Sequence, residues 1–239
     1  MRNIGNKLKV LIACEESQAV CKEFRAWGHQ AYSCDILPTS GEHPEWHIQG
    51  DVLSYLNDGW DMIIGFPPCT YMTNGGAVRM YPKKGEIDQD RYQKAMKAKE
   101  FFMAIYNAPA QYIAIENPLP MKVIGLPPKT QMIQPYQFGD PYSKKTCLWL
   151  KNLPELVPTN VLSEYQPFIN GGGGRMNRAH YKGKKFAAGS IARSKTFPGI
   201  ARAMAQQWSR NINWSYQNQL REQWLLYNPE AEYEGWMSI

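Results

Sequence analysis

Short apolar runs alternate with longer segments of helical periodicity in the first half of the chain. The apolar runs predict strands at residues 8–14, 30–37, 47–52, 60–66 and 111–118. Between them, one-sided apolar faces predict helices at residues 17–28 and 88–107. Strands that alternate with helices are typical of a parallel sheet covered on both faces, so the sequence predicts an α/β fold.

The pattern changes after residue 130. Two further strands are predicted at 131–139 and 144–152, and the stretch from 154 to 189 is loop-like and holds the glycine run 171–174. A helix is predicted at 196–208, and the tail that follows begins with helical periodicity. We therefore expect a main core at 1–153, a small loop-rich region at 154–189, and C-terminal helices that return to the core at 190–239.

Composition narrows the class of protein. No apolar run approaches the ~20 residues of a membrane span, and the N-terminus lacks the features of a signal peptide, which predicts a soluble, cytosolic protein without membrane contact. The five cysteines are odd in number and form no CxxC pair, which argues against a disulfide framework and a zinc site, so no metal is expected. A net charge of +6 is compatible with a nucleic-acid partner but does not decide it.

The segment GFPPCTYMTNGG, residues 65–76, follows the predicted strand at 60–66. Pro67 and Pro68 lack the backbone donor that a sheet needs, so the strand ends there and the chain leaves it along a stiff path. Cys69 is therefore presented at a strand end before a polar, glycine-containing segment, as a nucleophile would be. Packing is the better interpretation for the thiols within predicted helices and strands, Cys21, Cys34 and Cys147.

Glu116, in the segment IENP, ends the predicted strand at 111–118. Neighbouring strands lie about 5 Å apart, so Cys69 and Glu116 face one pocket if their strands are adjacent. Together they would supply a nucleophile and a proton donor, whereas Glu116 alone is equally suited to capping a helix or pairing with a lysine. Asp35 and Asp51 also follow predicted strands, at the sheet edge where α/β folds bind ligands.

The motifs FPPCT and IENP, with their order along residues 8–210, resemble those of the cytosine-C5 DNA methyltransferases. FPPCT is similar to the PPCQ nucleophile motif of that family, and IENP to its ENV motif. The resemblance implies a Rossmann-like, S-adenosylmethionine-dependent methyltransferase fold with a mostly parallel sheet and a small target-recognition region. It also implies methyl transfer to cytosine C5 in double-stranded DNA, on a base flipped out of the stack. The resemblance implies a compact member of the family, of the kind that a phage or mobile element encodes.

The resemblance also implies roles for individual side chains. Cys69 would add to C6 of the cytosine, and Glu116 would donate a proton or hydrogen bond at N3. Lys144 and Thr146 stand where the family has two arginines, so a charge is kept at one position and lost at the other.

On the cofactor side the resemblance is mixed. Asp35 matches the family residue that takes the ribose hydroxyls, and the family's glycine-rich first loop is replaced by a segment without glycine, where Glu15 would bind the cofactor's ammonium group or only cap the helix. The predicted cofactor-binding residues are Cys14, Glu15, Asp35, Ile36, Asp51, Val52, Phe66, Pro67, Ser194 and Lys195.

Two basic stretches are candidates for phosphate contacts: residues 79–85 after the nucleophile segment, and residues 175–185. A solvated surface loop has the same composition, so this alternative stays open. The predicted nucleic-acid-binding residues are Arg79, Arg175, Arg178, Tyr181, Lys182, Lys184 and Lys185.

Two other functions remain. Enzymes that methylate exocyclic amines carry a D/N/S-P-P-Y/F/W motif at the same strand end. This chain has Phe66 in place of the first, polar residue of that motif and Cys69 in place of the last, aromatic one. The second alternative is a non-catalytic relative that binds nucleic acid or a nucleotide through the same cleft. The glycine-free first loop and the replaced arginines favour that alternative.

Overall fold

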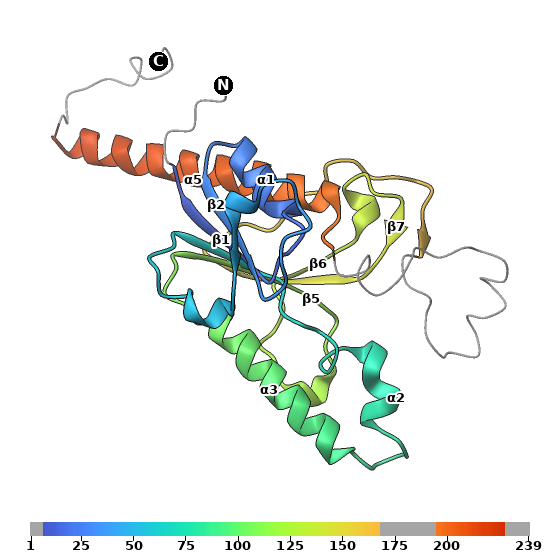
Figure 1. Cartoon of the computed structure of the whole chain (residues 1–239). Coiled ribbons are helices and arrows are strands. Elements are labelled where there is room, and N and C mark those ends of the chain that lie inside the picture. Colours follow the sequence, from blue (N-terminus) through green and yellow to red (C-terminus); the bar gives the residue numbers. More distant parts are fainter. Residues whose placement is uncertain (1–6, 168–194, 228–239) are drawn as a thin grey trace.

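A seven-stranded sheet crosses the molecule between two layers of helices (Figure 1). The computed structural model describes residues 7–167 and 195–227, with the side chains of the last helix described as far as residue 212. In spatial order the strands are β3 (His47–Gln49), β2 (Gln30–Asp35), β1 (Lys9–Ala13), β4 (Met62–Gly65), β5 (Tyr112–Pro118), β8 (Thr146–Lys151) and β6 (Gln131–Ile133).

All neighbouring pairs from β3 to β5 are parallel, and only β8 runs antiparallel to its neighbours β5 and β6. The order 3-2-1-4-5 is that of a Rossmann-type sheet, in which the order reverses between β1 and β4. The predicted mostly parallel, Rossmann-like α/β fold is confirmed. Ligands in such sheets bind beyond the carboxyl ends of the strands near this reversal.

Each face of the sheet has its own hydrophobic core. On one face α1 (Ala19–Ala26) packs against α5 (Pro198–Tyr227), and Phe24, Met204 and Trp208 are fully buried between them and the sheet. On the other face α3 (Gln89–Tyr106) buries Phe102 and Ile105. The strands contribute side chains to both cores because their residues alternate between the two faces.

The layer of α1 and α5 is tied to β1 through a buried histidine. His29 accepts from the backbone N–H of Leu8 through Nδ1 (3.2 Å), and its Nε2 hydrogen-bonds the Ser209 hydroxyl (2.8 Å). Burial lowers the pKa of His29 to about 4. The ring is therefore neutral near pH 7 and acts as a structural link.

The second half of the chain agrees with the prediction in part. Both predicted strands exist, but β8 inserts between β5 and β6, so the outer strand β6 precedes it in sequence. The sequence pattern did not reveal the separate sheet of β7 (Tyr142–Ser143) and β9 (Gln166–Pro167), nor helix α2 (Ala77–Met80). These elements are too short to carry a periodic signal. The 3-10 helices are η1 (Pro44–Trp46), η2 (Val52–Ser54), η3 (Asn74–Gly76), η4 (Lys122–Ile124) and η5 (Pro135–Gln137).

The predicted helix at 196–208 and the start of the tail form one continuous helix, α5. Pro198 is its first residue, where proline is tolerated because that N–H has no partner within the helix. Across residues 7–167 and 195–227, no helix has both the length and the apolar character of a membrane span.

Candidate active site

Strand β4 delivers Cys69 to the carboxyl edge of the sheet. All four residues of β4 are buried, and the N–H of Phe66 makes the last bond to β1, with the Ala13 carbonyl (2.9 Å). After Pro67 and Pro68 the chain turns back, because the Cys69 carbonyl accepts from the N–H groups of Met72 (3.1 Å) and Thr73 (3.3 Å). Cys69 is only partly buried at the start of this turn, as the two prolines predict.

Glu116 lies on the strand next to β4. β4 and β5 are parallel neighbours in which Gly65 pairs with Ile115, so the chain leaves β4 beside the last residues of β5, which continues to Pro118. Adjacency of the two strands was the condition for Cys69 and Glu116 to face one pocket, and the sheet order meets it. Glu116 is partly exposed at this edge.

Charges at this edge influence one another. Burial raises the pKa of the Cys69 thiol, the negative charge of Glu116 raises it further, and the positive charge of Lys144 lowers it. Burial also raises the pKa of Glu116, while Lys144 and a hydrogen bond with Thr146 lower it. The structure therefore brings together the four residues that were predicted as catalytic: Cys69, Glu116, Lys144 and Thr146.

Thr146 owes its place to β8. This strand runs antiparallel beside β5, with Thr146 opposite Pro118 and Leu148 opposite Glu116. Lys144 comes two residues earlier, and the Thr146 hydroxyl donates to its carbonyl (3.2 Å). An antiparallel return is required here, because it brings the start of β8 to the edge where the parallel strands end.

Asn117 joins the nucleophile segment to β5, and the sequence analysis did not single it out. Its side chain is fully buried, and its Nδ2 donates to the carbonyl of Pro67 (3.2 Å). The loops after β4 and β5 are also paired through their backbones, since Asn74 donates to Leu119 (3.1 Å) and Met121 donates to Met72 (2.8 Å). The position of Asn117 directly after Glu116 was the only signal in the sequence.

Arg91, in the first turn of α3, holds the other side of the same segment. Its Nη2 donates to the Thr70 carbonyl (3.0 Å), and its guanidinium lies over the ring of Tyr71, 5.1 Å from the centroid. Gly76 packs so closely that a Cβ there would lie 2.6 Å from Nη2. The turn that begins at Cys69 is thus fixed from the sheet by Asn117 and from α3 by Arg91.

The basic stretch after this segment is exposed. Arg79, Lys83 and Lys84 are solvent-exposed, and so is Val78, with 78% of its surface accessible. Helix α2, which carries Arg79, projects beyond the sheet edge on the α3 side, whereas β7 lies on the α5 side (Figure 1). The other predicted DNA-binding residues, Arg175, Arg178, Tyr181, Lys182, Lys184 and Lys185, lie outside the described residues, as does Ser194.

The predicted cofactor residues gather at the ends of β1, β2 and β3. Burial raises the pKa of Cys14, and the charges of Asp35 and Asp51 raise it further, so both carboxylates lie close to this thiol. Asp35 ends β2, whereas Asp51 follows β3 and caps η2 by accepting from the N–H of Leu53 (3.0 Å). Ile36 is 72% exposed, Val52 and Pro67 are buried, and Phe66 is half-buried.

The glycine-free first loop is held by its own side chains. Glu15 is buried and accepts from the N–H groups of Val20 (2.7 Å) and Cys21 (3.2 Å), which is the helix-capping alternative predicted for it. Burial raises the pKa of Glu15 to about 7. The Gln18 side chain donates to the backbone carbonyl of His43 (2.6 Å) and accepts from the backbone N–H of His43 (3.1 Å). These two bonds join the first loop to the loop that follows β2.

Lys195 reaches the same region from the start of α5. Its Nζ donates to the Ser40 hydroxyl (3.0 Å) and lies 3.7 Å from a carboxylate oxygen of Glu16. The residue predicted for the cofactor side therefore contacts the loops after β1 and β2. A role for it in binding a cofactor stays a prediction.

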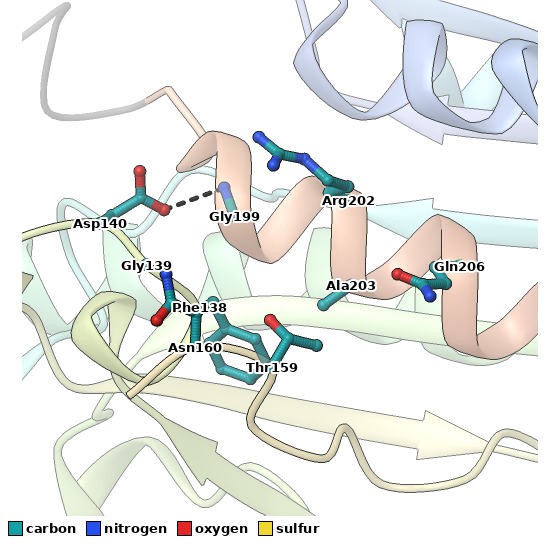
Figure 2. Close-up of a pocket in the computed structure, with 9 residues that line it drawn as sticks. All are labelled: Phe138, Gly139, Asp140, Thr159, Asn160, Gly199, Arg202, Ala203 and Gln206. Carbon is teal, nitrogen blue, oxygen red and sulfur yellow. Dashed lines mark hydrogen bonds between the residues drawn. The ribbon is translucent and has the colours of Figure 1, made fainter. Parts of the chain in front are cut away.

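A pocket of ≈ 270 Å³ opens elsewhere, at the first turns of α5 (Figure 2). Its lining includes Thr159, Asn160 and Arg202, but none of the predicted site residues. The Asp140 carboxylate already accepts from the N–H of Gly199 at the helix start (2.9 Å), as Figure 2 shows. Among residues 7–167 and 195–227, no group of three His, Cys, Asp or Glu side chains is arranged to hold a metal ion.

Comparisons with known proteins give a likeness of fold. No family model matches the chain, and no curated protein matches it. Among solved structures, it is similar to a candidate DNA modification methyltransferase encoded within a prophage (E. coli), at 16% identity and a TM-score of 0.42. That match covers 65% of this chain and 52% of the other, so the chain spans about half the length of that protein.

Proposed function

We propose that the protein is a DNA (cytosine-5-)-methyltransferase that transfers a methyl group from S-adenosylmethionine through a covalent adduct on Cys69. One observation carries the proposal. Cys69 follows β4, and Glu116 lies near the end of the adjacent parallel strand β5, close enough that the Glu116 charge raises the pKa of the thiol. A thiol and a carboxyl group at one sheet edge are the two groups that activation of a cytosine ring requires.

Cys69 and Glu116 have separate roles in the proposed reaction. The Cys69 thiolate adds to C6 while Glu116 gives a proton to N3, and C5 becomes nucleophilic enough to take a methyl group. A base then removes the C5 proton, the bond between sulfur and C6 breaks to return the Cys69 thiolate, and N3 gives its proton back to Glu116, which leaves the aromatic 5-methylcytosine. The target base must leave the duplex to reach the partly buried Cys69 at this edge of the sheet.

The charge of Glu116 affects the ionisation of Cys69. The pKa of Cys69 is raised partly by that charge, so protonation of Glu116 removes one obstacle to the thiolate. Lys144 lowers the pKa of both groups and therefore favours the negative charge of either one. The form with a thiolate and a protonated Glu116 is the reactive one.

S-adenosylmethionine supplies the methyl group. The residues at the ends of β2 and β3 fit its adenosine half, since Asp35 suits the ribose hydroxyls and the exposed Ile36 suits the adenine ring. In the first loop Cys14 has φ 61°, a left-handed backbone conformation that glycine usually supplies. The loop therefore has a glycine-like turn, while its Glu15 is engaged as a helix cap.

A specific observation favours a second candidate, a non-catalytic protein that binds nucleic acid through the same edge. Glu15 and Gln18 close the first loop with bonds that the family's glycines do not make, which alters the place expected for the methionine half of the cofactor.

The test is incubation with labelled S-adenosylmethionine and duplex DNA, for the natural protein and for Cys69→Ser. Label on cytosine C5 that is lost in the variant supports the proposal. Label on an exocyclic nitrogen indicates an amino-methyltransferase, and DNA binding without transfer indicates the second candidate. DNA that contains 5-fluorocytosine gives a stable covalent adduct with the natural protein. Fluorine replaces the C5 proton whose removal would release Cys69, and a base cannot remove it.

A further inference from the structure

Two tyrosines stack on the surface at the β7 side of the sheet edge. Tyr136 lies in η5 and Tyr165 lies just before β9. Their rings are parallel to within 7° with centroids 4.0 Å apart, and Tyr165 keeps 48% of its surface exposed. One face of Tyr165 is covered by Tyr136, and about half of the Tyr165 surface remains open to solvent.

The tyrosine pair, Tyr136 and Tyr165, is held in place before any ligand arrives. A hydrogen bond joins the two side chains. The backbone of Tyr136 accepts from the N–H of Leu162 (2.9 Å), and Gln166 donates to Pro141 (3.1 Å), so the two segments are fixed to each other. The same segments line the pocket in Figure 2 through Asn160 and Gly139.

The pair is linked to the candidate active site by a short stretch of chain. η5 packs against β7, and Lys144 follows β7 directly. The charge of Lys144 acts on both Cys69 and Glu116. The segment that carries the tyrosine pair is thus connected through β7 and Lys144 to the edge where Cys69 lies.

Aromatic pairs in proteins usually prefer offset or edge-on arrangements with centroids 4.5–7 Å apart. A closer, parallel and exposed pair offers a flat face of the kind on which unpaired bases stack. A base that leaves a duplex deprives its neighbours of a stacking partner, which such a face replaces. We propose that the tyrosine pair binds an unstacked base of the DNA beside the target cytosine; this inference rests on the proposed function.

The test is equilibrium binding of the full chain to a fluorescein-labelled oligonucleotide, single-stranded or in a duplex, followed by anisotropy. Tyr165→Leu removes the ring, and we expect single-stranded binding to weaken about 5- to 150-fold. Tyr165→Phe keeps the ring and binds nearly as tightly as the natural protein. The salt dependence of binding is unchanged in Tyr165→Leu because no phosphate contact is lost.

Several outcomes overturn the inference: unchanged affinity in Tyr165→Leu, an equal loss in Tyr165→Phe, or no oligonucleotide binding by the natural protein. A shift in sedimentation of Tyr165→Leu from dimer to monomer also overturns it, since the pair would then cover a second copy of this chain. Failure of the proposed function gives a different result. In that case Tyr165→Leu weakens binding while the natural protein transfers no methyl group to C5.

Discussion

The two halves of the carboxyl edge are built in different ways. In the half formed by β4 and β5, the loop after the nucleophile is held by Arg91 and Asn117, which bind its backbone carbonyls. In the half formed by β1 and β2, acidic side chains hold the backbone themselves: Glu15 caps α1, and Asp35 accepts from the N–H of Leu37 (2.9 Å).

The difference shows which groups each half keeps for chemistry. Burial raises the pKa of Cys69, Glu116 and Glu15 alike. In the β4 and β5 half the charges of Glu116 and Lys144 also act on the Cys69 thiol, and such coupling is typical of reacting groups. In the other half the Glu15 carboxylate is held by backbone N–H groups as a helix cap. The predictions below test this contrast.

The largest expected effect is in the nucleophile half. Cys69→Ser should lower methyl transfer by at least about 10³-fold and abolish the adduct with 5-fluorocytosine DNA, because a serine hydroxyl is a far weaker nucleophile. Cys14→Ser changes the thiol of the other half and should still form the adduct, with an altered dependence on cofactor concentration. Gel detection of the adduct measures both, and an adduct in Cys69→Ser would contradict the assignment.

Glu116→Gln should lower methyl transfer about 10²- to 10⁴-fold, because glutamine keeps the shape but cannot give a proton to N3. The variant should also lower the pKa of Cys69, since the charge that raises it is gone. Alkylation of Cys69 by iodoacetamide as a function of pH measures that shift. Faster transfer, or an unmoved thiol titration, would show that the two groups do not interact.

The supporting carboxylate should instead affect stability. The pKa of Glu15 is about 7 in the folded chain, above its ordinary 4.5, so its contribution to stability is lost as pH rises from about 4.5 to about 7. The pKa of His29 is about 4, below its ordinary 6.5, so its contribution is lost as pH falls from about 6.5 to about 4. The two slopes oppose each other in the natural protein.

Substitution of either residue should expose the slope of the other. In Glu15→Gln we expect the free energy of unfolding to fall by about 3 kcal/mol between pH 6.5 and 4, and in His29→Gln by a similar amount between pH 4.5 and 7. Urea unfolding at a series of pH values measures both. Identical pH profiles in the two variants would contradict the opposite signs.

The smallest expected effect is on the support of the nucleophile loop. Arg91→Ala should slow adduct formation about 10- to 100-fold by letting Cys69 drift from its position. The rate of adduct formation in Arg91→Lys should lie between those of the natural protein and Arg91→Ala. Lysine keeps the charge but loses the planar guanidinium that contacts both Thr70 and Tyr71. Stopped time courses of adduct formation measure the rate, and an unchanged rate in Arg91→Ala would remove Arg91 as a positioning residue.

The sequence by itself determined the alternation that gives the parallel sheet, and the exit of the chain at Pro67 and Pro68. Both are local: hydrophobic periodicity and the missing donor of proline act within a few residues. It also marked Cys69 and Glu116 as strand-end residues, because their segments adjoin the apolar runs that form β4 and β5.

Only the tertiary structure decided which strand ends meet. The adjacency of β4 and β5, and the antiparallel return of β8 that brings Thr146 to Glu116, depend on pairings between residues far apart in the chain. The support that Asn117 gives to the Pro67 carbonyl depends on the same pairings, since a hydrogen bond across 50 residues leaves no local pattern. The bond from Arg91 to Thr70, across 21 residues, likewise has no local signal. Acidic side chains thus have a proposed chemical role in one half of the edge, at Glu116, and a structural role in the other, at Glu15.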